Sequence, residues 1–214
     1  MKKIAIYLAG SIQKGHERSN ESKWTEEDRQ LLRKCLPGFA LSFLNPDLRT
    51  DDLSDQMSVF GRDMLQVHSS DLVFVDARDR RGLGVGAEMM WAKYNRIPVL
   101  TWAPRESHYH KSHASILGVP VQNWVHPFVE SLSDAIVSDL KEGAAWIETK
   151  LFDPAHPKKG MEFVHAAMGH YKKTQFPQDE PMKKLISSCE NLRSRIDRIP
   201  QGFHRLETKY TEIT

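Results

Sequence analysis

The chain has 214 residues, of which 40% are hydrophobic, enough to bury the core of one domain with an appendage. Its formal net charge is +2 with both signs mixed, which argues against an extended nucleic-acid-binding surface. No apolar run approaches the roughly 20 residues of a membrane-spanning helix. The two cysteines lie far apart and outside any CxxC pattern, so we expect a protein of a reducing compartment, the cytoplasm.

The first half of the chain alternates short apolar runs with segments that favour helix. Runs rich in β-branched and aromatic residues predict strands at residues 4–9, 39–44 and 72–75. The first predicted helix begins near Ser19 or Ser22, and Thr25 with Asp28 offers an alternative capping box. A second helix is predicted from about Met57 to His68, where apolar residues recur at helical spacing.

The third strand opens the best-defined unit of the chain. It is followed by a charged loop at 76–81, a glycine-spaced turn at 82–86, a helix over 87–94 and a further strand at 97–100. This order places Glu88 in the first helical turn, beside the carboxyl end of the strand, where open parallel sheets bind ligands. A carboxylate there is either a charge that stabilises the helix N-terminus or a catalytic group, and position alone favours the first role.

The second half continues the alternation. A loop at 103–118, a fifth short strand at 121–125 and a long amphipathic helix at 128–152 complete the predicted domain. Regular alternation of strand and helix predicts an α/β fold, a Rossmann-like (flavodoxin-like) sheet of five parallel strands in the order 2-1-3-4-5, sandwiched by helices. We therefore predict an α/β domain at residues 1–150 and a helical C-terminal extension at 151–214.

The extension has a different character from the α/β domain. A short helix is predicted at 161–171, then a linker at 174–181. Proline suits the first position of a helix, so Pro181 is expected to open a helix that reaches about Ile199. Oligomerisation or coverage of the site are the two roles that we consider for this extension.

Two glycine-rich motifs are excluded for the central unit. The run Gly82-Leu83-Gly84-Val85-Gly86 is not a dinucleotide fingerprint, because a charged loop separates it from its strand and the next strand is not followed by an acidic residue. A phosphate-binding P-loop is excluded because no Gly-Lys-Ser/Thr sequence follows.

Other polar residues are ambiguous when each is taken alone. The loop that contains His108, His110 and His113 has three possible roles: a solvated loop first, anion binding second and a metal site last. The metal site is last because no carboxylate or cysteine completes a ligand set. Asp63, on the helix before the third strand, has the pattern of a solvated helix charge. Tyr7 has the pattern of a core aromatic residue whose hydroxyl is satisfied at the end of a strand.

Several short stretches are more informative together than apart. They are YLAGSI at 7–12, DML at 63–65, SDLV at 70–73, LGVGAE at 83–88, and Ala92 with IPV at 97–99. Together they resemble the nucleoside 2-deoxyribosyltransferase superfamily, closest to its branch of 2′-deoxynucleoside 5′-monophosphate N-glycosidases and CMP N-glycosidases. The resemblance covers about residues 4–145, and LGVGAE is its most specific element.

The resemblance implies a chemical role for three side chains. Glu88 matches the family nucleophile, which attacks C1′ and forms a glycosyl-enzyme ester. Asp63 matches the aspartate that binds the sugar hydroxyls or assists protonation of the leaving base, and Tyr7 matches the tyrosine that orients the nucleophile. With this match, the catalytic role of Glu88 overtakes the structural one. The predicted substrate-binding residues are Gly10, Ser11, Ile12, Gln13, Asn45, Gly82, Gly84, Gly86 and His113.

The chain departs from the family where phosphate is bound. Phosphate-binding members carry an arginine after GSI and a serine before LGVG, and this chain has Gln13 and Gly82 there. Other cations in nearby loops are candidates to replace them, namely Lys14, Arg80, Arg81 and the cluster at 105–113.

The expected activity is hydrolysis of the base–sugar bond of a nucleoside or a nucleoside 5′-monophosphate. The alternatives are a 2-deoxyribosyltransferase that exchanges bases, a non-catalytic nucleotide-binding or sensing module, and an assembly protein that recruits a partner through its C-terminal helices. No metal and no organic cofactor is expected, and neither a membrane nor a nucleic-acid polymer is expected as a partner. The family implies a homodimer, in which the 105–118 loop is the candidate to complete a neighbouring site.

Overall fold

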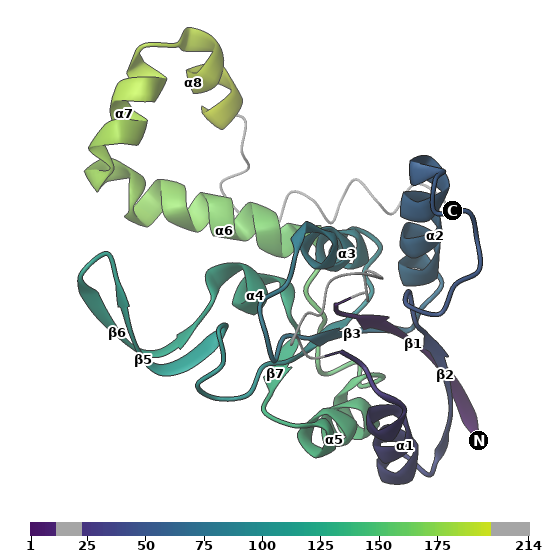
Figure 1. Cartoon of the computed structure of the whole chain (residues 1–214). Helices are drawn as coiled ribbons and strands as arrows, with labels where there is room; N and C mark the ends of the chain where they lie inside the picture. The colour runs from purple at the N-terminus through teal and green to yellow at the C-terminus, as the bar shows by residue number, and fades with distance from the viewer. Residues whose placement is uncertain (12–22, 198–214) are drawn as a thin grey trace. The chain divides into compact units, whose positions relative to one another are not determined.

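The computed structural model describes residues 1–11 and 23–197, which belong to two compact units, Met1–Lys159 and Gly160–Thr214 (Figure 1). The first unit continues past residue 150 because its last residues are tied to it. The Lys159 backbone N–H donates to Asp134 Oδ1 at 2.6 Å, and Lys158 Nζ donates to the Lys150 carbonyl at 2.7 Å. Residues 151–159 therefore belong to the α/β unit.

A five-stranded, all-parallel sheet forms the centre of the first unit. Its strands are β1 (Lys2–Ala9), β2 (Phe39–Leu44), β3 (Leu72–Asp76), β4 (Val99–Trp102) and β7 (Ala135–Val137), in the order β2-β1-β3-β4-β7. This arrangement confirms the predicted α/β, Rossmann-like class.

Helices cover both faces of this sheet (Figure 1). The helices α1 (Glu26–Cys35) and α5 (Leu140–Lys150) cover one face, and α2 (Gln56–His68), α3 (Leu83–Tyr94) and α4 (Pro127–Leu132) lie on the other. Alternate side chains of a strand enter opposite cores, so Ile6 and Leu8 pack with α1 and α5. Tyr7 enters the core of α2, α3 and α4, which places a phenol on the same face as Glu88.

The first helix begins later than Ser19 or Ser22, positions that lie outside the described residues. Thr25 is its N-cap, and the capping box with Asp28 is complete: Thr25 Oγ1 accepts from the Asp28 N–H at 3.1 Å, and Asp28 Oδ2 accepts from the Thr25 N–H at 3.0 Å. The alternative capping box is therefore the start of α1.

The predicted fifth strand exists, but the prediction that it pairs within the parallel sheet was wrong. Residues 121–125 belong to β6 (Val119–Val125), which pairs antiparallel with β5 (His110–Ile116) in a separate hairpin. The turn between them uses positive φ angles at Leu117 and Gly118, 50° and 83°. These two backbone conformations allow a tight reversal that a pattern of apolar residues does not reveal.

The predicted helix at 128–152 is also wrong, because three elements occupy it: α4, β7 and α5. Ser133 has an extended backbone and ends α4, and Asp139 caps α5 by accepting from the N–H groups of Lys141 and Glu142, each at 2.8 Å. The β-branched residues of Ala135–Val137 complete the edge of the parallel sheet beside β4.

The second unit consists of short helices. They are α6 (Met161–Thr174), the 3₁₀ helix η1 (Phe176–Gln178), α7 (Glu180–Ser187) and α8 (Glu190–Asp197). The single predicted helix from Pro181 to about Ile199 is wrong, since α7 ends at Ser187 and a new helix begins at Glu190. Asp179 is the N-cap of α7 and also accepts from Tyr171 Oη at 2.6 Å, which ties α7 to α6. Along residues 1–11 and 23–197, no helix is both long and apolar enough to cross a membrane.

Two helical glycines provide a test of packing in the first unit. A Cβ at Gly143 of α5 would lie 2.7 Å from Cζ of the buried Phe74, whereas a Cβ at Gly61 of α2 would meet nothing within 4 Å. We expect Gly143→Ala to destabilise the protein by about 1–3 kcal/mol through overpacking. Gly61→Ala should stabilise it by about 0.5–1 kcal/mol through helix propensity. Urea unfolding of both variants checks this, and equal effects of the two substitutions would contradict the packing described.

Candidate active site

The centre of the candidate site is a hydrogen bond between Tyr7 and Glu88, two residues separated by 81 positions. Tyr7 lies in the carboxyl half of β1, and its hydroxyl donates to Glu88 Oε1 at 2.9 Å. Both side chains are buried, Tyr7 completely and Glu88 with 6% of its surface exposed. Helix α3 begins at Leu83, so Glu88 is its sixth residue and lies in the second turn, one turn further along than predicted.

The other carboxylate oxygen of Glu88 is the more informative one. Oε2 is buried and accepts no hydrogen bond from any described residue. The pKa of Glu88 is raised to about 7: burial raises it most, the hydrogen bond from Tyr7 lowers it, and the charge of Asp63 raises it. Burial and the charge of Glu88 raise the pKa of Tyr7, so the phenol keeps its proton and remains the donor.

Asp63 of α2 is electrostatically coupled to this pair. Its negative charge raises the pKa of both Tyr7 and Glu88. Asp63 itself lies 3.6 Å from Arg49 Nη1 and 3.5 Å from Arg62 Nη1. Burial raises the pKa of Asp63, while the two guanidinium groups lower it. The structure therefore joins Tyr7 and Glu88, two of the predicted catalytic residues, by a hydrogen bond, and the charge of the third, Asp63, acts on both.

The residues after β1 and β2 have structural roles that the sequence did not reveal. A Cβ at Gly10 would lie 3.3 Å from Trp24 Cδ1, so glycine makes room for the indole, whose Nε1 donates to the Ala9 carbonyl at 3.0 Å. Ser11 follows at the same end of β1. Asn45, directly after β2, is buried, and its Oδ1 accepts from the Asp47 N–H at 3.0 Å. Ile12 and Gln13 lie outside the described residues.

Glycines at the start of α3 leave its first turn with few side chains. Gly82 is the N-cap, and Gly84 and Gly86 lie in the first four helical positions. A Cβ at any of the three would meet nothing within 4 Å, and all three residues are exposed. Since internal packing does not require glycine here, its effect is to expose the unpaired N–H groups of a helix N-terminus.

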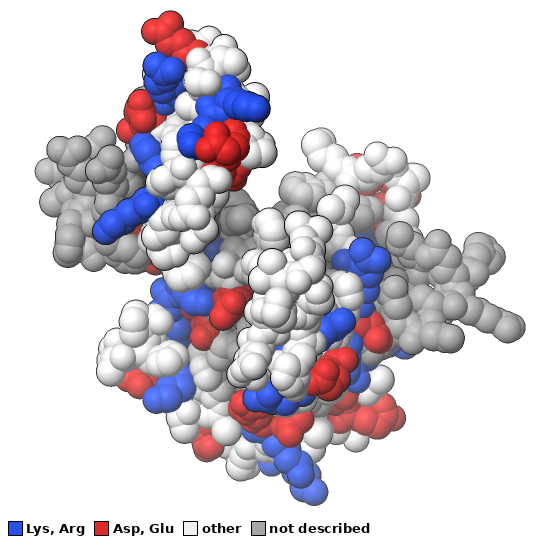
Figure 2. Space-filling model, turned by 90° about the vertical axis from the view of Figure 1, so that its left-hand side faces the viewer, with Lys and Arg blue, Asp and Glu red and all other residues white. Residues whose placement is uncertain are grey.

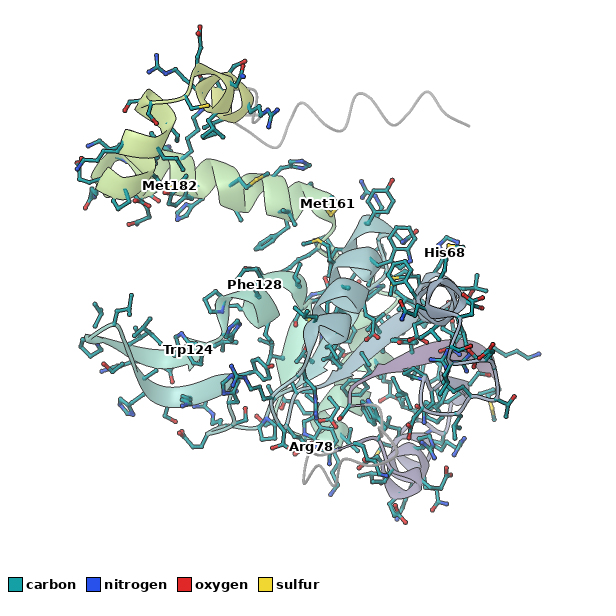
Figure 3. The ribbon with its side chains drawn as sticks, turned by 45° about the horizontal axis from the view of Figure 1, so that its top comes forward. His68, Arg78, Trp124, Phe128, Met161 and Met182 are labelled. Atoms are coloured by element: carbon teal, nitrogen blue, oxygen red, sulfur yellow. The ribbon has the colours of Figure 1, made fainter. Side chains whose placement is uncertain are left out.

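His113 is not brought to the Tyr7–Glu88 pair. It is exposed on β5, where it pairs in register with Gln122 of β6. The hairpin projects to one side of the sheet, and Trp124 of β6 and Phe128 of α4 lie on that side (Figure 3). Figure 2 shows the molecule from this side, where residues other than Lys, Arg, Asp and Glu form a white area with charged residues around it. A role for His113 at the site of its own chain is therefore not supported.

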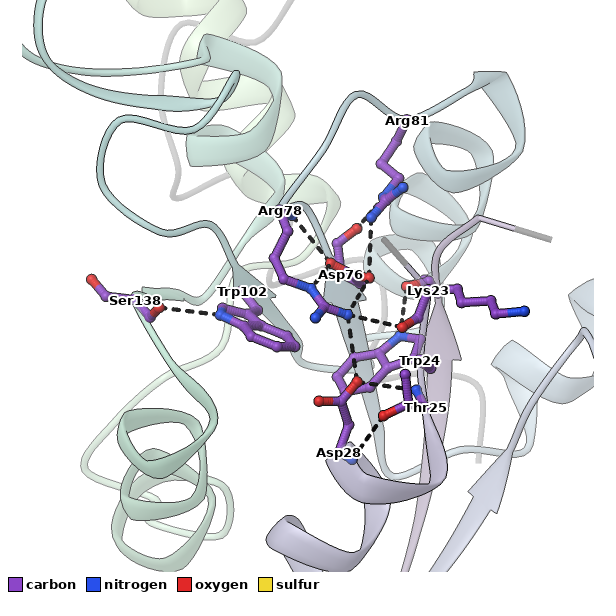
Figure 4. Close-up of polar contacts among 10 residues, drawn as sticks. Lys23, Trp24, Thr25, Asp28, Asp76, Arg78, Arg81, Trp102 and Ser138 are labelled. Carbon is purple, nitrogen blue, oxygen red and sulfur yellow. Dashed lines mark hydrogen bonds and ion pairs between the residues drawn. The ribbon is translucent and has the colours of Figure 1, made fainter. Parts of the chain in front are cut away.

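A cluster that sequence reasoning missed surrounds Asp76, at the end of β3 (Figure 4). Arg78 binds both carboxylate oxygens of Asp76 at 2.9 Å, and its guanidinium stacks on Trp102 at 3.8 Å from the ring centroid. Arg81 Nη2 lies 3.1 Å from Asp76 Oδ2, and the Arg81 N–H donates to Tyr109 Oη at 2.7 Å. These contacts anchor the loop that leads into α3. An acidic strand end followed by three closely spaced arginines, at 78, 80 and 81, was the available signal.

No match to this chain is found among models of known protein families or among curated protein sequences. The family resemblance therefore depends on the short motifs quoted above. Across residues 1–11 and 23–197, no group of three His, Cys, Asp or Glu side chains is arranged to hold a metal ion.

The Tyr7 hydrogen bond can be tested without any assumption about activity. The bond from Tyr7 lowers the pKa of Glu88, so Tyr7→Phe should raise that pKa above its value of about 7, by about one unit. Carboxyl ¹³C NMR titration of both proteins measures the change. Tyr94→Phe, at an exposed tyrosine of α3, is the matched control and should leave the midpoint of Glu88 unchanged. An unchanged midpoint in Tyr7→Phe would refute the assigned bond.

Proposed function

We propose that this protein is an N-glycosidase that cleaves the base–sugar bond of a nucleoside or a nucleoside 5′-monophosphate, with Glu88 as the nucleophile. The observation that carries the proposal is the Glu88 carboxylate. One of its oxygens is held by Tyr7, and the other is buried without a hydrogen-bond donor among the described residues. An oriented carboxylate with one unsatisfied oxygen is suited to attack an electron-poor carbon.

The proposed first step requires the two carboxyl groups in opposite protonation states. Glu88 Oε2 attacks C1′, the C1′–N bond breaks, and its electron pair goes to the base nitrogen. The leaving base takes a proton from Asp63, and the product is a glycosyl ester of Glu88. Burial raises the pKa of both Glu88 and Asp63, and the charge of Asp63 also raises that of Glu88, so the pair favours a state that holds one proton. In the free protein that proton is on Glu88, whose pKa is about 7, and the proposed step requires it on Asp63 when the substrate is bound.

The second step restores the free protein. Water attacks C1′, the ester bond to Glu88 breaks with its electron pair returning to the carboxylate, and Asp63 takes the proton from water. If a free base attacks instead of water, the same intermediate gives base exchange, so a transferase needs no additional residue. The family resemblance supports this chemistry, and it further suggests a cytoplasmic homodimer, which sedimentation of the full chain would test.

The test is a chromatographic search for free base. The protein is incubated with ribo- and deoxyribonucleosides and their 5′-monophosphates, with and without an acceptor base. Glu88→Ala should reduce base release at least about 10³-fold. Glu148→Gln, an exposed glutamate on α5, is the matched control and should retain full activity. Release that survives in Glu88→Ala would reject the nucleophile, and tight binding without release from any substrate would favour a nucleotide-binding module.

A further inference from the structure

Four charged residues form a closed square of ion pairs between the loop after β2 and helix α2. Arg49 and Asp51 come from the loop, and Arg62 and Asp63 come from the helix. Each arginine faces both aspartates: Arg49 lies 2.5 Å from Asp51 and 3.6 Å from Asp63, and Arg62 lies 3.7 Å from Asp51 and 3.5 Å from Asp63. We refer to these four residues as the ion square.

The two aspartates of the ion square differ in environment. The side chain of Asp63 is 13% exposed and that of Asp51 is 29% exposed, so Asp63 is the inner corner and Asp51 is the corner nearer to solvent. Arg62 also donates to the carbonyls of Pro46 and Leu48, at 3.4 and 2.7 Å, which holds the loop against α2. Arg49 is 9% exposed and spans both aspartates.

The inner corner of the ion square is electrostatically coupled to the candidate site. Arg49 and Asp51 from the loop and Arg62 from its own helix act on the pKa of Asp63, and the charge of Asp63 raises the pKa of Tyr7 on β1 and of Glu88 on α3. Both guanidinium groups lower the pKa of Asp63, because each nearby opposite charge favours the charged form. Asp51 shares both guanidinium groups and so reduces their effect on Asp63.

We propose that Arg49 and Arg62 are positioning residues that hold Asp63 at the candidate site, and that Asp51 is the counter-ion that shares both guanidinium groups with Asp63. The proposal depends on the proposed function only for the catalytic use of Asp63. The position and the titration of Asp63 are properties of the protein itself. They can therefore be measured whether or not a substrate is known.

The experiment is a carboxyl ¹³C NMR titration of Asp63 in the full chain. Arg49→Met removes one positive charge and should raise the midpoint of Asp63 by about one pH unit. Asp51→Asn removes the competing negative charge and should lower the midpoint. Arg49→Lys keeps the charge and should restore most of the shift. Arg33→Met, which removes an exposed arginine paired with Glu26 on α1, is the matched control and should leave the midpoint unchanged.

Opposite shifts in Arg49→Met and Asp51→Asn support the proposal, because a general loss of structure would not change sign between them. Unchanged midpoints in both variants overturn it. If Arg49→Met fails to fold, Asp51→Asn decides, since Asp51 is a partly exposed loop residue. Where base release is found, the alkaline limb of its pH profile should move with the midpoint of Asp63. Opposite shifts without base release from any substrate would support the positioning roles and reject the proposed function.

Discussion

Glu88→Gln is expected to remove a large pH dependence of stability and, on the proposed function, to abolish base release. The pKa of Glu88 is about 7 in the folded protein, against 4.5 for an ordinary glutamate. Between these two values the unfolded chain has released the proton and the folded chain retains it. Stability therefore falls as the pH rises from about 4.5 to about 7, by about 3 kcal/mol in total.

The measurement is the free energy of unfolding in urea at pH 4 and at pH 8, for the wild type and Glu88→Gln. Glutamine keeps an oxygen that can accept from Tyr7 but does not ionise, so the variant should lose about 3 kcal/mol less than the wild type over this range. Titrating groups that are not coupled to Glu88 contribute equally to both proteins and cancel in the comparison. Parallel pH profiles of stability would mean that burial does not raise the pKa of Glu88. Greater stability of an inactive variant at pH 8 is the expected signature of a carboxylate retained for chemistry.

Asp134→Ala is expected to destabilise the first unit by about 3–5 kcal/mol, because it removes one charge of a buried ion pair. Asp134 Oδ2 accepts from Lys93 Nζ and from the Val99 N–H at 2.6 Å, and Oδ1 accepts from the Lys159 N–H at 2.6 Å. The side chains of Asp134 and Lys93 are 2% and 1% exposed. The substitution leaves the lysine without this negative charge and removes the acceptor for two backbone groups.

Removal of the other partner of this ion pair, Lys93, should cost less stability. In Lys93→Met the Asp134 carboxylate keeps two backbone donors, so we expect a loss of about 1–3 kcal/mol. Glu26→Gln, which weakens exposed ion pairs with Arg29 and Arg33, is the control and should change stability by less than about 1 kcal/mol. Urea unfolding measures all three. Equal losses for Asp134→Ala and Lys93→Met would show that the backbone hydrogen bonds of Asp134 contribute little.

Several local elements of the α/β unit could be predicted from the sequence. Apolar runs of the right length predicted the strands at 39–44 and 72–75. The second is buried along its whole length, and a strand buried on both faces contains few polar residues. Thr25 and Asp28 predicted the start of α1, because all the residues of a capping box lie within four positions of the chain. The class of fold followed from the alternation of these elements.

The errors arose where local patterns were ambiguous. Residues 121–125 have the composition of a strand, but composition does not specify the partner, and the turn at Leu117 and Gly118 directs them into a hairpin. Ala135–Val137 is too short to interrupt a helical pattern by itself, and it becomes a strand because β4 offers an unpaired edge. The edge of a sheet is a tertiary feature and has no local signature.

By itself, the sequence determined most of the local elements and, from their alternation, the α/β class, because each element depends on residues close together in the chain. Only the tertiary structure decided which side chains share a site. It brought Tyr7 to Glu88 across 81 positions, joined Arg49 and Asp51 to Arg62 and Asp63, and kept His113 apart on the hairpin. The physical reason is that periodicity and capping act over a few residues, whereas burial and charge pairing act between residues that only folding makes neighbours.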